Sequence, residues 1–197
     1  MIVIAPDSFK ESLSATKVAI AMAEGINRIK PGDELISIPM ADGGEGTVEA
    51  LITATAGKIV KVPSVDALNR PIESYYGILG DGKTAIIEMA ATSGIEQLTA
   101  NERNPTIATT FGTGLLLKAA LDNGFSEIII GIGGSATNDG GTGMAQALGF
   151  KLLDETGDPI GLGGNSLHKF RRIDFSKVHP LLASAKITVA CDVQNTL

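Results

Sequence analysis

A glycine-rich stretch in the middle of the chain has the residue types of an anion-binding loop. Residues 131–143 contain six glycines, and the polar residues among them include Ser135, Thr137, Asn138 and Asp139. Glycines let the backbone turn its amide groups onto a ligand, and hydroxyl and amide side chains add hydrogen-bond donors. A short helix is expected at residues 144–148, and its positive end would also favour an anion. The stretch predicts a phosphate cradle; the alternative is an ordinary strand-to-helix turn capped by Ser135 or Thr137.

Aspartates follow three of the apolar runs that look like strands. The runs are residues 2–5, 35–40 and 187–190, and the aspartates are Asp7, Asp42 and Asp192. Ligands of parallel sheets bind at the carboxyl ends of the strands, where a carboxylate can hold a divalent cation or accept a proton. An aspartate after a strand more commonly stabilises a turn, so the two interpretations stay open for Asp7 and Asp42.

The elements that must position these residues belong to the α/β class. The β-branched run at residues 128–132 predicts a buried central strand, and residues 2–5 predict another. Ser14 is expected to cap a helix whose apolar residues recur at helical spacing, and a second helix is expected at residues 48–55. Strands alternate with helices and glycine-bearing loops, so the sequence predicts a parallel sheet covered on both faces.

Residues 77–84 match the phosphate-loop pattern G-x-x-x-x-G-K-[ST] letter for letter. A true phosphate loop joins a strand to a helix. Here residues 84–89 favour another strand, and Gly80-Asp-Gly82 is a typical hairpin turn. The segment therefore predicts a β-hairpin with Lys83 exposed near its tip.

A second glycine turn precedes the helix expected at residues 115–121. Thr113 lies in this turn, and it is either part of an anion site or the N-cap of the helix. Further back, the chain changes from helix-bearing units to a hairpin-rich stretch near residues 60–80. We therefore expect two domains, at residues 1–75 and 76–197.

Composition narrows the possible partners. The chain has 197 residues, a formal net charge of −6 and a pI near 4.9, so it lacks the basic surface of a protein that binds nucleic acid or anionic membranes. It has no basic leader and no apolar run of membrane-spanning length, which predicts a cytoplasmic protein. Its single cysteine excludes an intramolecular disulfide. A homo-oligomer is possible on these grounds.

Five segments together resemble the bacterial type I glycerate kinases, in the same order and over essentially the whole chain. The segments are Ala5-Pro-Asp-Ser-Phe-Lys-Glu-Ser-Leu-Ser-Ala15, Pro39-Met-Ala-Asp-Gly-Gly-Glu-Gly-Thr47, Glu102-Arg-Asn-Pro105, Gly112-Thr-Gly114 and Gly131-Ile-Gly-Gly-Ser-Ala-Thr-Asn-Asp-Gly-Gly141. The resemblance implies ATP-dependent phosphorylation of D-glycerate with Mg²⁺. It also implies a flavodoxin-like domain, formed by the beginning and end of the chain, with a second α/β domain inserted.

Members of that family are considerably longer than this chain, so both domains are expected to be incomplete. Where the family has Asn-Pro-Leu, this chain ends with Thr196 in the proline position. The alternative to an active kinase is therefore a non-catalytic fragment that retains weak binding of nucleotide or glycerate.

The proposed chemistry assigns candidate roles. Phosphate or nucleotide binding is expected at Gly133, Gly134, Ser135, Thr137, Asn138, Asp139 and Thr113. The substrate is expected to contact Ser8, Lys10 and Arg103, because a cation must hold its carboxylate. Catalysis is expected from Asp42, Asp7, Asp192 and Lys10, with Asp42 and Asp192 as Mg²⁺ ligands. Lys10 could equally be a solvated loop residue, and Arg103 could pair with Glu102 or Asp192.

Overall fold

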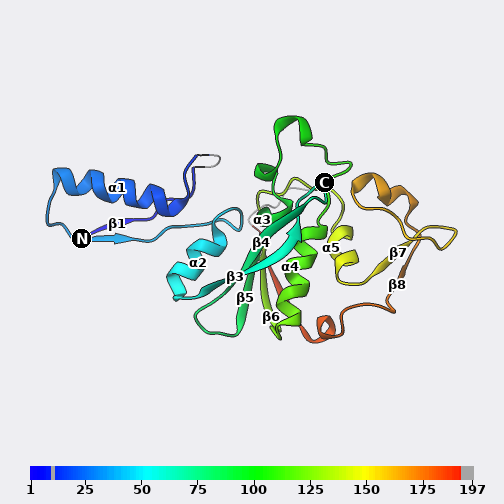
Figure 1. Cartoon of the computed structure of the whole chain (residues 1–197). Helices are drawn as coiled ribbons and strands as arrows, with labels where there is room; N and C mark the ends of the chain where they lie inside the picture. Colours follow the sequence, from blue (N-terminus) through cyan, green and yellow to red (C-terminus); the bar gives the residue numbers. More distant parts are fainter. Residues whose placement is uncertain (10–11, 192–197) are drawn as a thin grey trace.

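The computed structural model describes residues 1–9 and 12–191 as an N-terminal α/β arm beside a larger α/β body (Figure 1). The arm contains β1 (Ile2–Ile4), α1 (Ala15–Ile29) and β2 (Leu35–Ser37). β1 and β2 pair in parallel, and backbone bonds from Ile38 N to Ile4 O and from Met40 N to Pro6 O, both 2.8 Å, continue the pairing. Ser14 caps α1 as predicted, with its hydroxyl accepting from Lys17 N.

The expectation of a buried first strand is only partly met. Ile4 is buried, but Val3 is 52% exposed. The physical reason is that β1 belongs to a two-stranded sheet, which has too few neighbours among the described residues to cover both faces.

The body is built on a five-stranded sheet in the order β3-β4-β5-β6-β9. The strands are β3 (Lys58–Val65), β4 (Pro71–Ile78), β5 (Thr84–Glu88), β6 (Glu127–Gly131) and β9 (Lys186–Ala190). β6 pairs in parallel with both β5 and β9, so it is an internal strand of the sheet, although β5 is the middle one. The α/β class is confirmed, but the sheet is mixed, because β3, β4 and β5 pair antiparallel through short connections.

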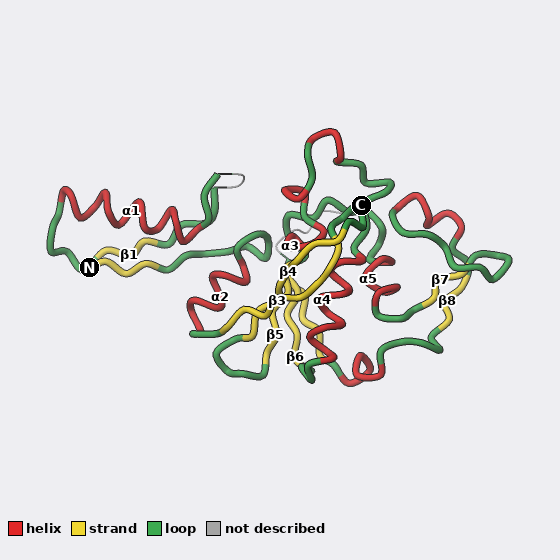
Figure 2. The backbone as a smooth tube through the Cα atoms, in the orientation of Figure 1, coloured by secondary structure: helices red, strands yellow, loops and turns green. Residues whose placement is uncertain are grey.

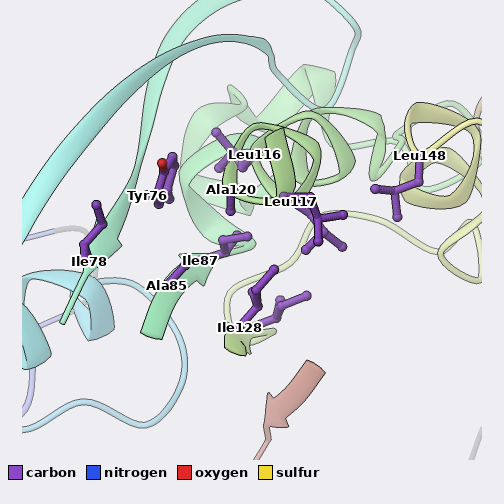
Figure 3. Close-up of a cluster of buried hydrophobic side chains, with 11 residues drawn as sticks. Tyr76, Ile78, Ala85, Ile87, Leu116, Leu117, Ala120, Ile128 and Leu148 are labelled. Atoms are coloured by element: carbon purple, nitrogen blue, oxygen red, sulfur yellow. The ribbon is translucent and has the colours of Figure 1, made fainter. Parts of the chain in front are cut away.

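Helices cover opposite faces of this sheet (Figure 2). α4 (Phe111–Asp122) packs on one face through Leu116, Leu117 and Ala120, against Tyr76, Ile87 and Ile128 of the strands (Figure 3). α2 (Thr47–Thr55) packs on the other face, over β4 and β5. The side chain of Val189 on β9 is 54% exposed, so the cover is incomplete at that edge of the described structure.

Short elements complete the body. They are α3 (Ala90–Ser93), α5 (Thr142–Ala147), β7 (Lys151–Leu153) and β8 (Arg172–Asp174), with 3₁₀ turns η1 (Ile95–Gln97), η2 (Ala100–Glu102), η3 (Gly164–Lys169) and η4 (Pro180–Ser184). β7 and β8 pair antiparallel apart from the main sheet. No helix in the described part of the chain is both long and apolar enough to cross a bilayer.

The division into two domains, at residues 1–75 and 76–197, stays a prediction, because independent folding of the two parts is not tested. Its position, however, falls within β4, whose residues pair continuously with β3. Sheet membership changes earlier, between the end of β2 at Ser37 and the start of β3 at Lys58.

The segment that matches a phosphate loop is a hairpin, as its neighbours predict. β4 and β5 pair antiparallel across it, and Gly82 has a positive φ of 67° that suits a tight turn. The carboxylate of Asp81 accepts from Thr84 N at 2.9 Å and from Thr84 Oγ1 at 2.7 Å, which ties the turn to the start of β5. Lys83 is exposed at this turn.

Lys83→Ala is expected to change the affinity of the chain for inorganic tripolyphosphate by no more than about twofold, because Lys83 lies on a hairpin turn rather than at a strand-to-helix loop. Isothermal titration calorimetry measures this affinity, with Lys58→Ala as a control for loss of one exposed positive charge. A loss of about tenfold in Lys83→Ala alone would show that the turn binds phosphate.

Candidate functional site

The loop after β2 lies directly on the carboxyl ends of β6 and β9. Gly133 N donates to Gly43 O at 3.0 Å, and Ile132 N donates to Ala190 O at 3.3 Å. A Cβ on Gly43 would lie 2.9 Å from Ala190 O, and one on Gly133 would lie 2.8 Å from Gly44 N. Only glycine permits this approach of the two backbones. Residues 39–47 and 131–141 therefore form one continuous surface, which we call the glycine surface.

The predicted phosphate loop lies on this surface. Gly134 and Asn138 are exposed, and Ser135 and Thr137 are half-buried, with their hydroxyl groups 2.8 Å apart. The backbone of the loop is fixed from the other side, since Ile95 N donates to Gly134 O and Ala136 N donates to Ser93 O, both at 2.9 Å. The structure thus brings together Gly133, Gly134, Ser135, Thr137 and Asn138 on one ordered turn.

Asp139 lies apart from these residues, although the sequence groups it with them. Its side chain is buried, with 1% exposure, and its carboxylate accepts from Thr110 N at 2.8 Å, Gly141 N at 3.1 Å and Gly143 N at 3.2 Å. These amides belong to the first turns of α4 and α5. Because a carboxylate already occupies the start of α5, that helix does not offer its positive end to a ligand. Asp139 therefore joins two helices inside the protein, and phosphate contact at this residue stays a prediction.

Thr113 is likewise not a surface residue. The sequence places it before the helix, but α4 begins at Phe111, and Thr113 is fully buried within the first turn. Its hydroxyl lies 3.0 Å from both Thr92 Oγ1 and Ser93 Oγ. These bonds satisfy the hydroxyl inside the protein, so they do not support the predicted phosphate contact at Thr113, which stays a prediction.

The predicted aspartates at the ends of β1 and β2 lie at the same edge of the small sheet. Asp7 and Asp42 are both exposed, and each carboxylate accepts from a nearby backbone amide, Ser8 N at 2.6 Å and Gly44 N at 2.9 Å. These carboxylates therefore do stabilise turns. Lys10 and Asp192 lie outside the described residues.

The predicted residues do not share one pocket. Ser8 lines a pocket of about 380 Å³ between the arm and α2, whereas Asp42 lines a separate groove with Gly43 and Cys191. Arg103 is exposed after η2. Its neighbour Glu102 pairs with Arg70, whose guanidinium also contacts Asp66 at 2.5 Å, so the exposed Arg70 is already paired with two carboxylates.

An acidic pocket that no sequence pattern above predicts lies beside the glycine surface. Glu88 ends β5 and is 1% exposed; its carboxylate accepts from Gly46 N at 2.6 Å and Val48 N at 3.1 Å, which caps α2. Burial raises the pKa of Glu88. A glutamate inside the apolar run of β5 is the sequence signal that could have indicated a buried functional or capping carboxylate.

Two further carboxylates meet at the mouth of this pocket. A hydrogen bond with Glu96, then partial burial and the nearby charges of Glu96 and Glu88, raise the pKa of Glu45 to about 7. Glu45 therefore holds a proton over much of the range below neutral pH, when it can donate a hydrogen bond. Burial raises the pKa of the neighbouring Tyr75 to about 12, so its phenol stays neutral.

Asp139→Asn is expected to lower the free energy of unfolding by about 3 kcal/mol, because one side-chain amide cannot accept all the bonds that the buried carboxylate accepts. Urea unfolding measures this change, with exposed Asp158→Asn as the matched control. If Asp139→Asn instead kept full stability and lost tripolyphosphate binding, Asp139 would contact the ligand rather than stabilise the two helices.

Comparison with known proteins places the chain among relatives about twice its length. The model of the glycerate kinase family matches residues 2–197. A glycerate kinase of Bacillus subtilis (strain 168) is 52% identical over 196 residues, which are 100% of this chain and 51% of the relative. A glycerate 2-kinase of Escherichia coli (strain K12) is 54% identical over 196 residues, again 100% of this chain and 51% of the relative.

A solved structure agrees with this result. A crystal structure from Salmonella typhimurium LT2, of a protein assigned as glycerate kinase 2, superposes with a TM-score of 0.83 at 52% identity and covers 99% of this chain and 53% of its own. The chain therefore spans about half the length of the relatives it matches. With its full length matched by the family model, and with this identity and this fold, the chain belongs to the glycerate kinase family.

Proposed function

We propose that the protein transfers the γ-phosphoryl group of ATP to a hydroxyl group of D-glycerate. The observation that carries this proposal is identity of 52–54% over the whole chain with relatives named glycerate kinase or glycerate 2-kinase. In the reaction, the glycerate oxygen forms a bond to phosphorus, the bond to the ADP oxygen breaks, and the hydroxyl proton passes to a base. Such chemistry depends mainly on positioning and charge stabilisation.

The glycine surface supports the phosphate-binding part of this proposal. Gly133, Gly134 and Ser135 lie on a turn whose backbone is anchored on both sides, and Asn138 is exposed on the same loop. An anchored turn presents its backbone without having to be ordered by the ligand, which lowers the entropic cost of binding. We therefore assign phosphate contact to this turn, with Thr137 beside it.

The strand-end aspartates are the candidates for proton transfer and for Mg²⁺. Mg²⁺ bound with ATP supplies charge neutralisation of the phosphates and is typically held by one or two carboxylates together with phosphate oxygens. No group of three or more acidic, histidine or cysteine side chains in residues 1–9 and 12–191 converges on a metal position. Exposed Asp42 fits the looser, phosphate-assisted site, and Asp192 remains its proposed partner outside the described residues.

A second candidate function is favoured by two observations. The chain spans about half of its relatives, and the two-stranded sheet of the arm leaves Val3 and Met40 half-exposed. On this view the 197-residue chain binds nucleotide or glycerate weakly without turnover. A cytoplasmic location and homo-oligomeric assembly stay predictions under both functions.

The kinase proposal is tested by coupled-enzyme turnover with D-glycerate and MgATP. We would compare the 197-residue chain alone with the same chain joined to the second half of the B. subtilis relative. In the active form, Asp42→Asn is expected to lower kcat by about 100-fold or more with little change in unfolding free energy, whereas exposed Asp33→Asn changes neither.

Three results would contradict parts of this account. No turnover by the joined protein would rule out the kinase proposal. Full turnover by the 197-residue chain alone would rule out the non-catalytic alternative. Parallel losses of kcat and stability in Asp42→Asn would make Asp42 a structural residue.

A further inference from the structure

The acidic pocket beside the glycine surface has the size and walls of a small-molecule site. It occupies about 420 Å³ between β4, η1 and the start of α3. This volume lies within the range of about 300–1,000 Å³ that is usual for ligand pockets. Ile72 and Ile95 give it apolar surface, and Tyr75 adds an aromatic ring. These side chains suit the faces of a planar, uncharged group.

The glutamates that line the pocket disfavour a negatively charged group placed among them. Its lining includes Glu45, Glu73, Glu88 and Glu96, and none of the described residues that line it is a lysine, arginine or histidine. Like charges repel more strongly near a protein surface than in water, because the effective dielectric constant is lower there. A phosphate or a substrate carboxylate would therefore be repelled from this pocket, although the glycine surface lies at its edge.

The same carboxylates do not form a cation site. Both oxygens of Glu88 are engaged by the amides of Gly46 and Val48, and Glu73 pairs with Lys61 at 2.6 Å. No metal-binding group of three such side chains occurs among the described residues. The remaining pair, Glu45 and Glu96, suits hydroxyl groups instead, because carboxylates commonly accept hydrogen bonds from the hydroxyls of a ribose.

Two glycines connect this pocket to the phosphate loop. Gly44 and Gly134 line the pocket, and the same stretch of backbone carries the contact between Gly43 and Gly133. A ligand with an uncharged, hydroxyl-bearing end in the pocket could thus extend a charged end along the glycines, away from the four glutamates.

We propose that this pocket binds the nucleoside part of ATP, with the base against Ile72, Tyr75 and Ile95 and the ribose hydroxyls on Glu45 and Glu96. The phosphates then follow the edge formed by Gly44 and Gly134. This inference rests on the proposed function, because it takes ATP as the ligand. It assigns the nucleoside to the pocket and the phosphates to the glycine edge.

The test is calorimetric titration of the 197-residue chain with two separate probes, adenosine and inorganic tripolyphosphate. Ile95→Ala and Glu96→Gln are each expected to weaken adenosine binding by about tenfold, because each removes a direct contact to the nucleoside. Ile95→Ala is expected to leave tripolyphosphate binding unchanged. Both side chains lie at the surface, so thermal unfolding should match that of the unsubstituted chain.

Matched controls carry the same chemical changes outside the pocket. Ile107→Ala replaces an isoleucine that is 54% exposed, and Glu155→Gln replaces an exposed glutamate. Neither is expected to alter adenosine binding. Failure of adenosine to bind the unsubstituted chain, or equal adenosine affinity in pocket and control variants, would overturn the inference.

The outcome separates this inference from the proposed function. If the joined protein turns over glycerate with an unchanged KM for ATP in Ile95→Ala and Glu96→Gln, the kinase proposal stands and the nucleoside pocket is wrong. If adenosine binds and both pocket variants weaken it while no phosphoryl transfer occurs, the pocket is supported and the kinase proposal fails.

Discussion

The close approach of the Gly43 backbone to the carboxyl ends of β6 and β9 is the contact on which the candidate site depends. The arm, the five-stranded sheet and the glycine loop come from distant parts of the chain, and this contact is where they meet. A side chain at Gly43 or Gly133 would collide with backbone, which cannot rotate away. The glycines of these two segments therefore have a structural role, because they allow the two loops to pack together as one surface.

Two buried carboxylates hold the elements around this contact. Glu88 receives the first amides of α2, and Asp139 receives the first amides of α4 and α5. Both residues are costly to bury, and their helix amides offset that cost. These buried acids fix the scaffold, whereas Gly134 and Asn138 of the glycine loop are exposed at its surface.

Much of this fold follows from local sequence, and the rest requires tertiary contacts. The apolar run of β6, the cap at Ser14 and the turn at Gly82 are decided by neighbouring residues, so pattern alone predicts them. Asp139 and Thr113 have the same local appearance as ligand-binding loop residues. Their burial is decided by how α4 packs against α5 and α3, which no local pattern contains. The acidic pocket could not be predicted from the sequence for the same reason, because Tyr75, Glu45 and Glu96 come from three separate segments.

Hydrogen exchange at the amide of Gly133 tests the central claim most directly. This amide donates to Gly43 O at 3.0 Å, so it should exchange much more slowly than an unstructured glycine. In Gly43→Ala, whose Cβ would lie 2.9 Å from Ala190 O, that protection should be lost while the amide of Ile129 in β6 stays protected. Exchange of Gly133 at the unprotected rate in the unsubstituted chain would contradict the joining of the two loops into one site.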